Sequence, residues 1–88
     1  MRVVNLRKEK FTHYIGRGSI FGNPYKIGVS GTRQDVVGNY EKYARNNPTL
    51  LEKIKTLPKE AVLGCYCAPL ECHGNIIIKI WKELHNEM

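Results

Sequence analysis

The residues of this chain best suited to chemistry are its cysteines, which all lie in one segment, GCYCAPLECHGN, residues 64–75. His73 directly follows the last of them. The segment lies between an apolar run typical of a strand and an amphipathic run typical of a helix. Ligands bind at such junctions in open α/β sheets, because a helix N-terminus offers N–H groups and a partial positive charge.

One interpretation of the segment is a zinc site with four ligands, Cys65, Cys67, Cys72 and His73. The spacing argues against it. Structural zinc sites favour pairs of cysteines with two to four residues between them, whereas Cys65 and Cys67 have one. Such sites also usually take their ligands from two separate turns. We therefore expect no cofactor and keep zinc as the alternative.

A second interpretation is a functional thiolate. A helix N-terminus stabilises a thiolate, so Cys72 with His73 beside it is the candidate catalytic pair. The competing interpretation places Cys65 in the core of the strand and makes Cys67 and Cys72 small fillers of a tight turn. We favour the core role for Cys65, and the two interpretations of Cys72 stay open.

A glycine-rich segment, GRGSIFGNP, holds Arg17 between two glycines and supplies neutral donors from Ser19 and Asn23. An arginine in such a loop presents a rigid fork of donors that suits phosphate or carboxylate. Nearby tyrosines such as Tyr14 and Tyr66 could stack on a base, although aromatic residues beside glycine turns more often pack. The predicted ligand-binding residues are Asn5, Arg7, Gly16, Arg17, Gly18, Ser19, Gly22, Asn23, Thr32, Arg33, Cys67, Gly74 and Asn75.

The pattern of apolar residues predicts the elements that position these side chains. Strands are expected at 2–6, 12–15 and 61–66, and helices at 32–45, from 48 to before Pro58, and after residue 75. Thr32 with Asp35 has the spacing of a capping box, and Asn47 before Pro48 is typical of a helix start. The order predicts an α/β fold: a small sandwich with a short mixed or parallel sheet and about three helices, Rossmann-like in part.

The 88 residues are expected to form one domain, 1–88, of net charge +6. The charge favours anionic partners, but no cluster of basic residues marks a dedicated DNA-binding arm. No secretory leader or membrane-length apolar run is present, so we expect a cytoplasmic protein with reduced thiols and no membrane partner. So small a domain leaves much surface exposed, which self-association would reduce.

The stretches VVNLR, YIGRGSIFGNPYKIG, GTR and LGCYCAPLECHGN together resemble the short bacterial and bacteriophage proteins of domain of unknown function 4326 (DUF4326). The resemblance spans nearly the whole chain and implies an intracellular protein of phage origin, but no reaction. The Cys-His-Gly turn is also similar to the Cys-His-Arg turn of another small α/β family with a Rossmann-like fold. That likeness concerns architecture alone.

Taken together, the residues predict a protein that binds a phosphate-bearing small molecule, a nucleotide or an ADP-ribose derivative, at strand-to-helix loops. One alternative is an enzyme that uses Cys72 and His73 on a nucleotide-type substrate. Another is a zinc-stabilised interaction module. Nucleic-acid binding rests on the net charge alone.

Overall fold

The computed structural model describes residues 1–25, 31–66, 70 and 72–85. In chain order its elements are β1 (Arg2–Asn5), β2 (His13–Tyr14), α1 (Arg33–Arg45), α2 (Pro48–Lys55), β3 (Val62–Cys65) and α3 (His73–His85). The predicted α/β class and the predicted order of elements are confirmed. Within the described residues, no helix has both the length and the apolar character that crossing a bilayer requires.

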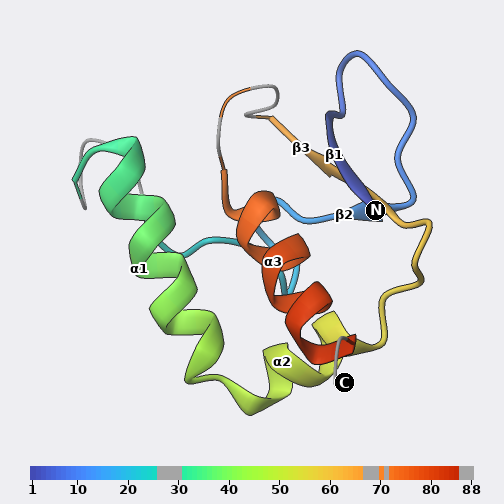
Figure 1. Cartoon of the computed structure of the whole chain (residues 1–88). Helices are drawn as coiled ribbons and strands as arrows, with labels where there is room; N and C mark the ends of the chain where they lie inside the picture. The colour runs from blue at the N-terminus through green and yellow to red at the C-terminus, as the bar shows by residue number, and fades with distance from the viewer. Residues whose placement is uncertain (26–30, 67–69, 71, 86–88) are drawn as a thin grey trace.

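The three strands form a parallel sheet in the order β1-β3-β2 (Figure 1). Val4 and Tyr14, on the two outer strands, both lie opposite Gly64 of the central strand. The central strand is the most apolar, as expected for a strand with a neighbour on each side. The carboxyl ends of β1 and β3, which come from opposite ends of the chain, therefore lie side by side.

Local sequence signals decide where the first two helices begin. Thr32 caps α1: its side chain accepts from the Asp35 N–H, while the Asp35 carboxylate accepts from the Thr32 N–H. Asn47 caps α2 through its side-chain oxygen, which accepts from the Leu50 N–H, and Pro48 takes the first helical position. Both caps satisfy N–H groups that would otherwise lack a partner, so both predicted starts are confirmed.

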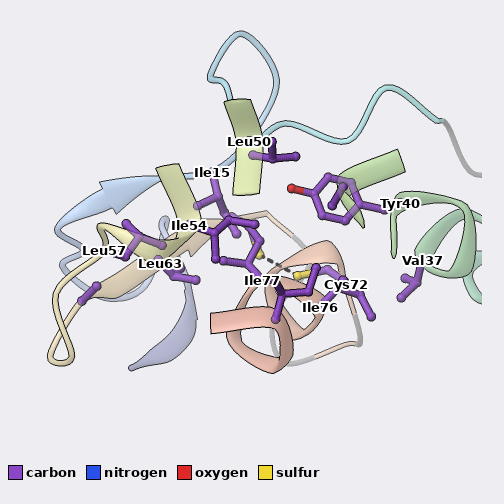
Figure 2. Close-up of a cluster of buried hydrophobic side chains, with 14 residues drawn as sticks. Ile15, Val37, Tyr40, Leu50, Ile54, Leu57, Leu63, Cys72, Ile76 and Ile77 are labelled. Atoms are coloured by element: carbon purple, nitrogen blue, oxygen red, sulfur yellow. Dashed lines mark hydrogen bonds between the residues drawn. The ribbon is translucent and has the colours of Figure 1, made fainter. Parts of the chain in front are cut away.

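The hydrophobic core lies between the helices and one face of the sheet (Figure 2). Figure 1 shows α3 between α1 and the sheet. Tyr40 of α1 is fully buried and its hydroxyl donates to the Phe21 carbonyl at 2.9 Å. Burial raises the pKa of Tyr40, so the phenol stays protonated. The Trp81 indole N–H likewise donates to the Leu57 carbonyl at 2.8 Å, joining α3 to the end of α2.

A surface ion network ties α1 to α3. The Arg45 guanidinium donates to both carboxylate oxygens of Glu83 and to Glu41, which Lys79 also contacts at 3.2 Å. Hydrogen bonds from Arg45 lower the pKa of both carboxyls. Ion pairs of this kind at the surface are weakened by salt.

The two faces of the sheet have different surroundings. Leu63 faces the helices and is part of the core, as is shown by its full burial. Gly64, the next residue, faces the other way, because neighbours along a strand point to opposite faces. A Cβ on Gly64 would lie 2.6 Å from Cγ of Phe11, so Phe11 lies on this second face. Val4, the register partner of Gly64, is buried on this face. We call it the open face, because the side chain that lies over Gly64, Phe11, is itself 42% exposed.

Candidate functional site

The carboxyl ends of β1 and β3 carry a small polar cluster built around Asn5. Its side-chain oxygen accepts from the Arg7 N–H at 3.0 Å, and its carbonyl accepts from the Lys8 and Glu9 N–H groups. Its amide nitrogen lies 3.5 Å from the Tyr66 carbonyl oxygen. Asn5 therefore holds the turn after β1 against the end of β3.

Arg7 and Tyr66 meet at this end of the sheet. The Arg7 guanidinium carbon lies 5.1 Å from the centre of the Tyr66 ring, within the range of a cation–π contact. The Tyr66 side chain follows β3 directly and is 56% exposed. A guanidinium carries five N–H donors, so Arg7 can contact the ring and still donate to an anion.

The loop after β1 lines an open depression of about 490 Å³. Its walls are Leu6, Arg7, Lys8, Glu9, Lys10 and Phe11. Three of these residues are cationic, and the one carboxylate, Glu9, is in an ion pair with Arg2 at 3.1 Å. The depression is therefore positively charged, with the aromatic ring of Phe11 at one end of the loop.

The start of α3 satisfies its own N–H groups. The Asn75 side chain accepts from the Cys72 N–H at 3.0 Å, and the Asn75 N–H donates to the Cys72 carbonyl at 3.0 Å. The Gly74 N–H lies 3.4 Å from Cys72 Sγ. Gly74 and Asn75 were predicted to cradle an anion; any anion there would compete with these bonds.

Gly74 has a packing role that the sequence did not predict. A Cβ at this position would lie 2.8 Å from Val3 Cγ2 and 2.9 Å from Ile15 Cδ1. The absence of a side chain lets the first turn of α3 lie directly on the sheet. Close approach to the protein's own core is therefore enough to account for this glycine, and its role in ligand binding stays a prediction.

His73 is buried at the same helix start. Its Nε2 lies 2.6 Å from the Ile15 carbonyl oxygen, to which it donates, and its ring centre lies 5.0 Å from that of Tyr40. Burial lowers the pKa of His73, and the bond to the Ile15 carbonyl opposes that shift only in part. The imidazole therefore joins α3 to the end of β2 in its neutral form.

Cys65 and Cys72 lie side by side in the core, with their sulfur atoms 3.3 Å apart (Figure 2). Both are almost fully buried, so the predicted core role of Cys65 is confirmed. Cys67, the remaining cysteine, lies outside the described residues. Among the side chains that the structure describes, no three His, Cys, Asp or Glu groups are placed to hold a metal ion.

The glycine-rich loop is held together by its own polar groups. The Ser19 hydroxyl donates to the Gly16 carbonyl at 2.7 Å, and the Tyr14 hydroxyl donates to the Arg17 carbonyl at 2.9 Å. Gly18 has a φ of 89°, which favours glycine. The Arg17 side chain is exposed.

Gly22 and Asn23 close this loop against the rest of the chain. A Cβ on Gly22 would lie 2.8 Å from the Gly16 carbonyl oxygen. The Asn23 amide donates to the Val36 carbonyl of α1 at 3.3 Å, and its oxygen accepts from the Tyr25 N–H at 2.9 Å. The polar side chains predicted to meet a ligand here therefore make structural hydrogen bonds.

The predicted site residues fall into separate places. Asn5 and Arg7 come together at the end of β1, whereas Thr32 and Arg33 lie at the start of α1. Figure 1 shows that helix start and the loop after β1 on opposite sides of the view. The site residues predicted from the sequence did not include Lys8, Lys10 and Phe11, which line the depression after β1. The signal that could have indicated them is the group of three basic residues between Leu6 and Phe11.

A small parallel α/β domain with a basic, partly aromatic sheet end is the class of protein that the fold and site define. Residues 2–83 match the family described as Domain of unknown function (DUF4326), and the chain belongs to that family. It is similar to an uncharacterized 12.4 kDa protein in the nrdA-td intergenic region of Enterobacteria phage T4. The two are 34% identical over 89 residues, which cover 98% of this chain and 82% of the phage protein. No solved structure matches the chain.

Proposed function

We propose that this protein binds a nucleotide-type ligand at the carboxyl ends of β1 and β3, with the base against Tyr66 and the phosphate on Arg7. The single observation that carries the proposal is the Arg7–Tyr66 cation–π pair beside the positively charged depression. An aromatic face and an outward guanidinium edge are complementary to the two halves of a nucleotide.

The place of this pair in the fold supports the proposal. Ligands of open α/β sheets bind outside the carboxyl ends of the strands, because the loops that leave those ends can shape a site without disturbing the core. Lys8, one residue beyond Arg7, adds a second cation to the same wall. The net charge of +6 favours capture of an anion. With a nucleotide as its ligand, we also propose that the protein acts in the cytoplasm.

Titration calorimetry with AMP, ADP and ATP tests the proposal. We expect binding that weakens as salt is added, and a loss of about tenfold or more in affinity for Arg7→Ala, because a charge-assisted contact contributes about 1.5–3 kcal/mol. Tyr66→Leu should weaken binding of all three nucleotides similarly, since each carries the same base.

Lys82→Ala is the matched control, because Lys82 is an exposed cation at the far end of α3. It removes one positive charge and should leave the affinity within about twofold of the native value if long-range charge is screened. Absence of binding by all three nucleotides, or equal affinities in native protein and both site variants, would refute the proposal.

An enzyme that uses Cys72 and His73 stays a prediction. Both side chains are buried, and the described contacts of His73 are with Ile15 and Tyr40. A reaction at these groups would need the start of α3 to move away from the sheet. The geometry therefore favours binding over catalysis.

A further inference from the structure

Exposed aromatic side chains follow one another across the open face of the sheet. Phe11 lies over Gly64, Tyr14 is the register partner of Gly64, and Tyr66 directly follows the last residue of the central strand. Their exposed fractions are 42%, 38% and 56%. Contiguous exposed apolar surface is a feature of binding sites, and these aromatic rings are the apolar side chains that a partner could cover here.

The charges around these rings limit what the partner can be. The Arg7 guanidinium lies over the Tyr66 ring, and Lys8 and Lys10 lie in the loop that leads to Phe11. The Tyr14 hydroxyl donates to the backbone carbonyl of Arg17, whose side chain is exposed. Glu9 is the only acidic residue in residues 6–17, and it is in an ion pair with Arg2. Each aromatic ring therefore has a basic residue close to it in the structure or in the chain.

We infer that the open face binds single-stranded nucleic acid, with successive bases on Tyr66, Phe11 and Tyr14 and the phosphates along Arg7, Lys8, Lys10 and Arg17. The inference rests on the proposed nucleotide site, which becomes one end of a longer path. Rings that stack on bases beside cations that follow the backbone are how proteins bind single strands without reading sequence.

The same features argue for a single strand over a duplex or a protein. In a duplex the bases are stacked on one another and their faces cannot reach these rings. An acidic protein segment would satisfy the cations but would leave the row of exposed rings unexplained. A single strand offers unstacked bases to the aromatic rings and phosphates to the cations.

Fluorescence anisotropy with a labelled oligothymidylate of about eight nucleotides tests the inference. We expect it to bind at least tenfold more tightly than thymidine monophosphate, and a duplex of equal length to bind less tightly than the single strand. Tyr14→Leu and Arg17→Ala lie outside the mononucleotide site. Each should weaken oligonucleotide binding by about fivefold or more while leaving the affinity for thymidine monophosphate unchanged.

Two further variants separate stacking from folding. Tyr14→Phe retains a ring and should retain oligonucleotide binding, whereas Tyr14→Leu should not. Lys8 and Lys10 are exposed, so replacing both by alanine should leave the fold intact. The double variant should reduce the slope of log affinity against log salt by about 1.4, or about 0.7 for each lost phosphate contact.

The outcomes distinguish the two proposals. An oligonucleotide that binds no more tightly than the mononucleotide overturns the inference and leaves the nucleotide site standing. Equal binding of single strand and duplex, or equal binding by Tyr14→Leu and native protein, also overturns it. Length-dependent binding that is lost in Tyr14→Leu supports it even if the mononucleotide alone fails to bind.

Discussion

His73 is placed where an imidazolium would be costly, because its ring is buried between Tyr40 and the end of β2. Burial holds the pKa of His73 below its ordinary value of 6.5 in the folded protein. The unfolded chain therefore binds the proton more readily. The contribution of neutral His73 to the stability of the folded protein is complete above about pH 6.5 and is lost as the pH falls below that value.

We expect urea unfolding to give a lower free energy at about pH 5.5 than at about pH 7.5, a window above the range in which most carboxylates titrate. His73→Gln keeps a donor for the Ile15 carbonyl but does not titrate, so it should show a smaller difference between the two pH values. Equal differences in native protein and variant would contradict the assigned environment of His73.

Two glycines in helices show how packing can reverse the effect of a glycine-to-alanine substitution on stability. Gly38 lies in the middle of α1 with nothing within 4 Å of an added Cβ, whereas Gly74 lies against Val3 and Ile15. Alanine is a better helix former than glycine by about 1 kcal/mol. At Gly38 that gain is unopposed.

We therefore expect Gly38→Ala to raise the free energy of unfolding by about 0.5–1 kcal/mol. Gly74→Ala should lower it by about 1–3 kcal/mol, because the first turn of α3 must move away from the sheet. Chemical denaturation of the two variants beside native protein measures both. Stabilisation by Gly74→Ala would show that α3 does not lie as close to the sheet as described.

The buried thiols report on the molecule as a whole. Cys65 and Cys72 are 2% and 3% exposed, so an alkylating reagent can reach them only when the structure opens. In a Cys67→Ser variant, we expect labelling of the remaining thiols by a neutral maleimide to be slow under native conditions. The rate should increase as urea lowers the free energy of unfolding.

Gly38→Ala and Gly74→Ala, made in the Cys67→Ser background, provide the control. The first should slow labelling and the second should speed it, if opening is close to global unfolding. Fast labelling of native protein that is insensitive to urea would instead show that Cys72 is accessible. That result would favour the thiol-based alternative.

Signals confined to a few neighbouring residues determined most of the fold. Thr32 with Asp35, and Asn47 with Pro48, define helix starts through bonds that close within four residues, so no distant contact is needed to predict them. The apolar run that contains Leu63 predicted a central strand because burial on both faces excludes polar side chains. Family membership followed from motifs spread over the whole length of the chain.

Tertiary structure alone decided which residues share a surface. The sequence predicted one pocket from the end of the first strand, the glycine-rich loop, the helix start at Arg33 and the Cys72 turn. The fold places Arg7 with Tyr66 and buries His73. The row of Phe11, Tyr14 and Tyr66 exists only through the register of β2 on β3, which no local pattern encodes. The positions of these rings depend on pairings across about 50 residues of chain, and such contacts arise only when the core is assembled.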